Sequence, residues 1–256
     1  MPFPYDFKFD LNVFNEIFAI VNSPIFIGKL QSPNFLSIFK DGIDGMFSRI
    51  SGVNFNYHVI HTWDETFPKD IFNTESYLAS TLFNMDSALE CCIFGLNALG
   101  FSIDNNCFWN IGNSKDLKQI RITNVTGTEK QIVKGYQLYF LNFNNLWNKN
   151  KHLIKTIEEH HDVTKHRHFS LSGGDLRLDA PKSILKKYNV VKAIDLPSKV
   201  VPSQRVLLSN NPKQLNDGRK PSAPDNLLYL ENLAESFSTF LSDSGDMIKK
   251  DILKLL

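Results

Sequence analysis

The sequence has 256 residues, which is enough for one large domain or two small ones with a buried core. Hydrophobic residues make up 42% and charged residues 21% of the chain, as in folded globular proteins rather than disordered ones. The 28 Lys and Arg residues nearly balance the 27 Asp and Glu residues, so the net charge is +1. This balance excludes a globally basic nucleic-acid coat protein and an acidic solvating tail.

The cysteines and the N-terminal region favour a cytoplasmic protein. Three cysteines cannot form a disulfide framework, and the neighbours Cys91 and Cys92 point about 100° apart on a helix. The N-terminus lacks the basic region of a signal peptide. The apolar stretch at residues 17–30 is too short and too interrupted to span a bilayer. We therefore expect a reducing compartment and no membrane partner.

The first half of the chain predicts two helices separated by irregular structure. A short amphipathic helix is expected after Asp10. Residues 33–70 contain three turn-like pairs, two Asp-Gly and one Ser-Gly, and a weak alternation at residues 55–59 that favours a short strand. A long helix is expected from Asn73 or Thr74 to a C-terminal Gly100. Its buried stripe consists of Leu78, Leu82, Met85, Leu89, Cys92, Leu96 and Leu99.

Two further helices are predicted in the second half. One begins at a capping box formed by Thr128 and Gln131 and continues for about forty residues, with His160, Thr164 and Arg167 extending its buried stripe. Five asparagines between residues 142 and 150 predict a kink or a short break in it. The last helix starts at Ser222 and is expected to bend near residues 242–245.

These stripes predict an all-α fold, because amphipathic helices bury their apolar faces against one another. We expect an antiparallel bundle of four or five main helices that forms a single domain over residues 1–256. Residues 169–222 contain Gly173-Gly174, several prolines and β-branched pairs. This composition predicts an extended basic arm, or a short β-hairpin, within that domain.

The charge is unevenly distributed along the chain. Residues 145–222 contain 15 basic and seven acidic residues, a net charge of +8, whereas residues 1–144 have a net charge of −4 and residues 223–256 of −3. Five of the seven histidines also lie in the basic segment. Such a segment in a neutral protein is typical of a local anion site, and a solvated lysine-rich arm would produce the same pattern.

The candidate site lies at the end of the second long helix, in residues 158–168. Residues three or four apart share one helix face, so His161, Lys165 and His168 are aligned. Asp162 and His166 have the spacing of an ion pair. Polar groups that continue the buried face of a helix, where the preceding residues are apolar, indicate a functional site. The alternative is structural, since basic residues in a last turn also stabilise the helix dipole.

A metal site is not predicted here. Glu158 and His161 have the spacing of a di-iron ligand pair, but such bundles need a second Glu-x-x-His pair, which this sequence lacks. The histidines also lack the cysteine partners of a closed zinc site. We expect neither a metal nor a cofactor.

The helix SYLASTLFNMDSALECCIFGLNALG at residues 76–100, together with the later helix end EEHHDVTKHRHF, resembles the HEPN superfamily. The resemblance covers about a third of the chain. It implies a helical bundle, commonly a homodimer, with an arginine followed after four to six residues by a histidine. Arg167 matches the motif arginine, but positions 172–174 hold Ser172, Gly173 and Gly174 instead of the histidine.

The resemblance implies a protein that binds RNA or a nucleotide, and DNA is not predicted. Active members are similar to metal-independent ribonucleases, in which the arginine stabilises phosphate charge and the histidine transfers a proton. The missing histidine favours a non-catalytic member over a ribonuclease of a defence or toxin–antitoxin type. If the chain is catalytic, His161 or His168 would transfer the proton. Arg167 and Lys165 would then hold phosphate, with His160, Asp162 and His166 as further ligand-binding candidates. The alternative is a structural or interaction module that forms a homodimer.

Overall fold

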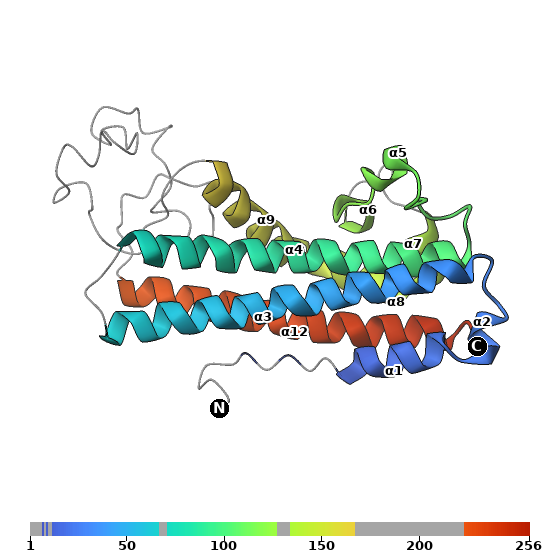
Figure 1. Ribbon diagram of the computed structural model, residues 1–256, viewed down its shortest axis with the longest axis horizontal. Helices are drawn as coiled ribbons and strands as arrows, with labels where there is room; N and C mark the ends of the chain where they lie inside the picture. Colours follow the sequence, from blue (N-terminus) through green and yellow to red (C-terminus); the bar gives the residue numbers. More distant parts are fainter. Residues whose placement is uncertain (1–6, 8, 10–11, 67–70, 127–133, 167–222) are drawn as a thin grey trace. The chain divides into compact units, whose positions relative to one another are not determined.

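The computed structural model describes residues 7, 9, 12–66, 71–126, 134–166 and 223–256 (Figure 1). Within these residues the regular secondary structure is helical and contains no strand. This confirms the predicted all-α class. The predicted arm or hairpin at residues 169–222 lies outside the described residues.

Four helices and one 3-10 turn form the first half of the chain. Two of the helices exceed thirty residues, and the expected short helix after Asp10 is present. In chain order the elements are α1 (Asn12–Val21), α2 (Pro24–Ile27), the 3-10 turn η1 (Pro33–Phe35), α3 (Leu36–Thr66) and α4 (Ile71–Ile103).

Six further helices are described after α4. They are α5 (Ser114–Leu117), α6 (Thr123–Thr126), α7 (Lys134–Tyr139), α8 (Leu141–Lys149), α9 (Lys151–His166) and α12 (Ala223–Leu253). The helix from residue 222 is confirmed, and α12 continues through residues 242–245 without a break. Two residues at the expected bend make contacts within this continuous helix and with α1. The Ser244 hydroxyl donates to the Phe240 carbonyl at 2.7 Å, and Gly245 leaves room for Val13 and Phe14 of α1.

The described residues divide into two compact units. The first contains residues 52–66, 71–84, 154–166 and 223–235, and the second contains the described parts of 7–51, 85–153 and 236–256. In the second unit α8 and α12 run antiparallel, because Asn142 bonds to Asp251 and Trp147 to Ser244. The core of the second unit is aromatic, as the phenylalanine content indicates; its largest buried rings are Phe14, Phe26, Phe39, Tyr136, Phe140, Phe143, Trp147 and Phe237.

The expected irregular structure and strand within residues 33–70 are wrong, since residues 36–66 form α3. The glycines that resemble turn residues instead allow α3 and α4 to approach closely. A Cβ atom on Gly42 would lie 2.5 Å from the Cα of Gly95, and one on Gly45 would lie 3.2 Å from the Cys91 sulfur. In the first unit, a Cβ on Gly52 would lie 2.6 Å from the Asn84 amide nitrogen. Helix packing therefore outweighs the low helix propensity of glycine.

The expected ends of the first long helix are also wrong. The helix begins at Ile71 rather than at Asn73 or Thr74, and it passes through Gly100 to Ile103. Gly100 is needed inside the helix because a Cβ atom there would lie 2.4 Å from the ring of Phe108. The glycine therefore serves packing rather than helix termination.

The single helix expected from residue 128 consists of three shorter helices over the described residues 134–166. One interruption is at Asn150, which confirms the expected break in the asparagine cluster. The other is at Phe140, where the buried Asp251 of α12 accepts hydrogen bonds from the backbone nitrogens of Asn142 (3.2 Å) and Phe143 (3.0 Å). A carboxylate from a distant segment therefore caps α8. The capping box at residues 128–131 lies outside the described residues.

Residues Ser76–Ile103 are long and apolar enough, by length and composition alone, to cross a membrane. However, 78% of the most apolar window of this helix is buried within the structure. A core helix of a soluble protein has the same properties, so this feature is weak support for a membrane span.

We expect Gly42→Ala to destabilise the protein by about 1–3 kcal/mol, because the new methyl group would overlap the backbone of Gly95. Gly45→Ala is the matched control, since it makes the same change in the same helix but faces a movable cysteine side chain. Chemical denaturation measures both free energies of unfolding. Equal effects of the two substitutions would contradict the close approach at Gly42.

Asp251→Ala should lower the free energy of unfolding by about 2–4 kcal/mol, because it leaves buried backbone nitrogens of α8 without an acceptor. The control is Asp246→Ala, which removes an exposed carboxylate from the same helix and should change the free energy of unfolding by less than about 0.5 kcal/mol. Thermal unfolding of both variants tests the cap. If Asp251→Ala unfolds at the same temperature as the wild type, the cap is ruled out.

Candidate functional site

Helix α9 buries one side, and Lys151, His152 and Lys155 are exposed on it. Ile157 and His160 are buried, as the periodicity predicts, and His160 has no exposed surface; Ile154 is buried where the pattern predicts Leu153, which is half-buried. Burial lowers the pKa of His160 to about 4, because the charged ring loses its hydration. His160 is therefore neutral at physiological pH. An imidazole in this position belongs to the core and is shielded from a ligand in solvent.

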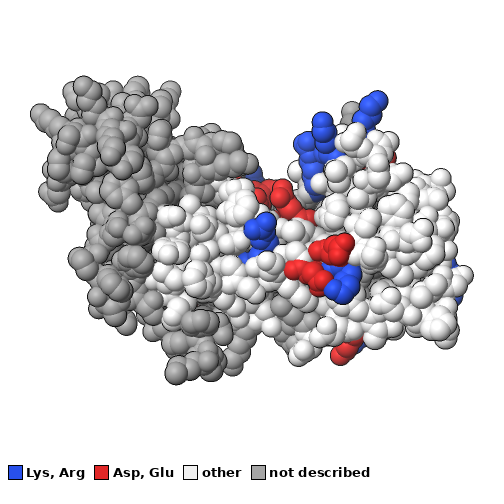
Figure 2. Space-filling model, viewed as in Figure 1, with Lys and Arg blue, Asp and Glu red and all other residues white. Residues whose placement is uncertain are grey.

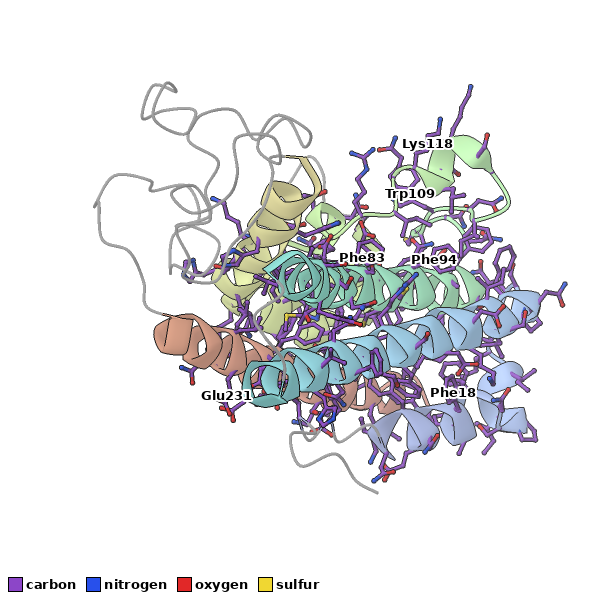
Figure 3. The ribbon with its side chains drawn as sticks, turned by 60° about the vertical axis from the view of Figure 1, so that its left-hand side comes forward. Phe18, Phe83, Phe94, Trp109, Lys118 and Glu231 are labelled. Atoms are coloured by element: carbon purple, nitrogen blue, oxygen red, sulfur yellow. The ribbon has the colours of Figure 1, made fainter. Side chains whose placement is uncertain are left out.

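His161 lies at the boundary between core and solvent. Its ring centroid is 5.3 Å from that of Phe83 on α4, with an angle of 72° between the planes, so the two rings meet edge to face. Phe83, labelled in Figure 3, is 41% exposed although most of its neighbours in α4 are buried. Two aromatic groups from separate helices thus form one partly exposed surface in the first unit.

Other predicted site residues continue from this pair along the chain. Asp162, Lys165 and His166 belong to α9, so Lys165 follows His161 by one helical turn. Their side chains are not described, and the expected ion pair between Asp162 and His166 stays a prediction. Arg167 and His168 lie outside the described residues. The structure therefore brings His161 together with Phe83, which the sequence analysis did not select.

Among the described residues, no group of three or more His, Cys, Asp and Glu side chains is arranged to hold a metal ion. Glu158 and His161 are on α9 as expected from their spacing, but no described carboxylates or histidines complete a cluster around them.

A polar network that the sequence analysis missed joins α4 to α7 in the second unit. The Tyr139 hydroxyl donates to a carboxylate oxygen of Asp104 at 2.8 Å. Hydrogen bonding from Cys107, and then from Asn106 and Tyr139, lowers the pKa of Asp104. The pKa of Cys107 is raised, mainly by burial and then by its bond to Asp104. The thiol is therefore kept protonated, which disfavours a nucleophilic role.

The cysteines are free thiols, as expected from their number and spacing. Cys92 is fully buried, and burial raises its pKa to about 12. Cys91 is half-buried against Gly45, and its pKa is also raised by burial. These two thiols are core groups rather than metal ligands or nucleophiles.

The buried His160 should make stability decrease in acid. Its pKa is about 4 in the folded chain and about 6.5 in the unfolded chain, so between these values only the unfolded chain binds the proton. When the pH falls from 7 to 4, the free energy of unfolding should therefore decrease by about 3 kcal/mol more in the wild type than in His160→Gln. Urea denaturation at each pH measures this difference. Parallel pH profiles for the two proteins would contradict a buried, neutral His160.

No family model matches this chain, and neither a curated protein nor a solved structure is significantly similar to it. A functional proposal therefore has to start from the side chains of α9 and its neighbours.

Proposed function

We propose that this protein binds single-stranded RNA through the C-terminal half of α9. The observation that supports this is the ring pair formed by Phe83 and His161, whose centroids are 5.3 Å apart at the surface of the first unit. Exposed aromatic rings are common stacking platforms for the unpaired bases of RNA. The partly exposed Phe83 beside His161 offers an aromatic surface of this kind.

The position of Lys165 supports a phosphate contact beside the rings. Because α9 is helical to His166, Lys165 follows His161 on the same face. An ammonium group one turn from a stacking surface can bind the phosphate that follows a stacked base. The resemblance to the HEPN superfamily assigns phosphate binding to Arg167, and we propose that Lys165 shares this task.

We propose binding without cleavage. The histidine of the family motif is replaced at positions 172–174, and His160 is neutral and buried. His161 is the described histidine with access to solvent on this part of α9, so it is the residue that would transfer a proton if cleavage took place. A reducing cytoplasm, where RNA is abundant and thiols stay free, is the proposed location.

A homodimeric interaction module is the second candidate. The second unit exposes several large apolar side chains, namely Ile25, Leu138, Leu141, Leu253 and Leu256. Interfaces between copies of a chain cover such groups. Sedimentation of the purified protein tests this candidate independently of RNA, and a monomer at micromolar concentration would rule it out.

Phe83→Ala should weaken binding to a labelled single-stranded RNA at least about fivefold, because one stacked base is worth about 1–3 kcal/mol. Lys165→Gln should weaken it as well, and most strongly at low salt. Fluorescence anisotropy measures both dissociation constants, and gel analysis of the same RNA detects cleavage.

Phe55→Ala is the control for Phe83→Ala, since Phe55 is a 54% exposed phenylalanine of the first unit on α3. Lys155→Ala is the control for Lys165→Gln, since Lys155 lies about 120° around α9 from His161. If the wild type does not bind RNA, or if the controls weaken binding as much as the test variants, the proposed site is wrong.

A further inference from the structure

The second unit has an excess of positive charge around the short helices α5 and α6. The described residues between positions 105 and 153 include one acidic residue, Asp116, and their other charged side chains are basic. The basic residues of this stretch are Lys115, Lys118, Arg121, Lys134, Lys149 and Lys151. Figure 2 shows Lys and Arg side chains projecting above the segment that contains α5 and α6, and Lys118 is labelled in Figure 3.

Hydrogen bonds bring two parts of this stretch together. The side-chain amides of Asn144 and Asn148 on α8 donate to the Val125 carbonyl of α6, at 3.1 and 3.3 Å. The α6 turn therefore lies directly on α8. Lys149 follows Asn148 as the last residue of α8, and Lys151 begins α9.

Further bonds hold Arg121 beside α6. Its backbone nitrogen donates to the Asn124 side chain at 2.8 Å, and its guanidinium Nε donates to the Lys118 carbonyl at 2.8 Å. These contacts place Lys118 and Arg121 on the segment that packs against the end of α8. We call the four residues Lys118, Arg121, Lys149 and Lys151 the basic surface.

The cations of the basic surface differ from other lysines of the second unit. Lys40 pairs with Asp44, Lys249 with Glu16, and Lys254 with Asp251. In contrast, none of the four basic-surface residues forms an ion pair with a carboxylate that the structure describes. Cations that are not paired with the described carboxylates can pair with the phosphates of a polyanion.

We infer that the basic surface binds the phosphate backbone of RNA. Four cations from two neighbouring segments match an extended row of phosphates better than a single anion. The inference rests on the proposed function for the choice of RNA as ligand. However, the basic surface shares no residue with the ring pair of Phe83 and His161, so each can be tested while the other is intact.

The test is the salt dependence of RNA binding by a fourfold variant, Lys118→Gln, Arg121→Gln, Lys149→Gln and Lys151→Gln. Each phosphate contact on a single strand contributes about 0.7 to the slope of log K against log salt. The variant should therefore bind more weakly at low salt, and the magnitude of its slope should be smaller than that of the wild type by about 2–3. Anisotropy titrations of a labelled single-stranded RNA between about 50 and 200 mM salt measure it.

The matched control is Lys40→Gln, Lys249→Gln, Lys250→Gln and Lys254→Gln, which removes the same charge from the second unit at positions outside the basic surface. Thermal unfolding verifies that both variants fold. The control should retain at least most of the wild-type slope. An equal loss of slope in both variants would show a general charge effect and would overturn the inference.

The remaining outcomes separate the inference from the proposed function. If the basic-surface variant keeps the wild-type slope while Phe83→Ala weakens binding, the inference fails and the proposed function stands. If the basic-surface variant loses slope while Phe83→Ala is silent, the ring site fails and the inference stands. If wild type binds polyglutamate as tightly as RNA, or binds no RNA, the basic surface does not recognise an RNA backbone.

Discussion

The buried carboxylate of Asp251 fixes the start of α8 in the second unit. It is 2% exposed and accepts two backbone hydrogen bonds at the start of α8, together with a 2.6 Å bond from the Asn142 amide. This cap ends the preceding segment at Phe140 and sets the start of α8. α6 packs on α8, and α9 begins two residues after its last residue. The segments that carry the basic surface are therefore held through one acidic side chain at least a hundred residues away in the sequence.

The all-α class and several helices could be predicted because periodicity is a local property. The stripe from Leu78 predicts the existence of α4, though not its ends, and the stripe that includes His160 correctly places that residue in the core. The region of α3 could not be predicted in the same way. Its glycines are poor helix formers in isolation, and their purpose becomes evident only when Gly42 is seen against Gly95 on another helix. The break at Phe140 has the same origin, since its cap comes from α12.

In the candidate site, too, the features set by neighbouring residues could be predicted and the contacts between distant segments could not. Helical spacing correctly places His161 and Lys165 in α9, one turn apart. Nothing in the sequence indicates that Phe83, 78 residues earlier, meets the ring of His161. The basic surface was missed for a different reason. Lys118 and Arg121 fall in the segment 1–144, whose net charge of −4 hides them, and only the packing of α6 on α8 brings them to Lys149.

The burial of the Cys92 thiol makes its chemical labelling a measure of how the core of the second unit opens in solution. Only the thiolate reacts with disulfide reagents, and a pKa of about 12 leaves roughly one thiolate in 10⁵ at neutral pH. The sulfur is also shielded from any reagent, because Cys92 is fully buried in α4. Labelling of this residue therefore requires a transient opening of the surrounding helices. The labelling rate of Cys92, followed separately from that of the more accessible Cys91 and Cys107, therefore reports how often the core opens.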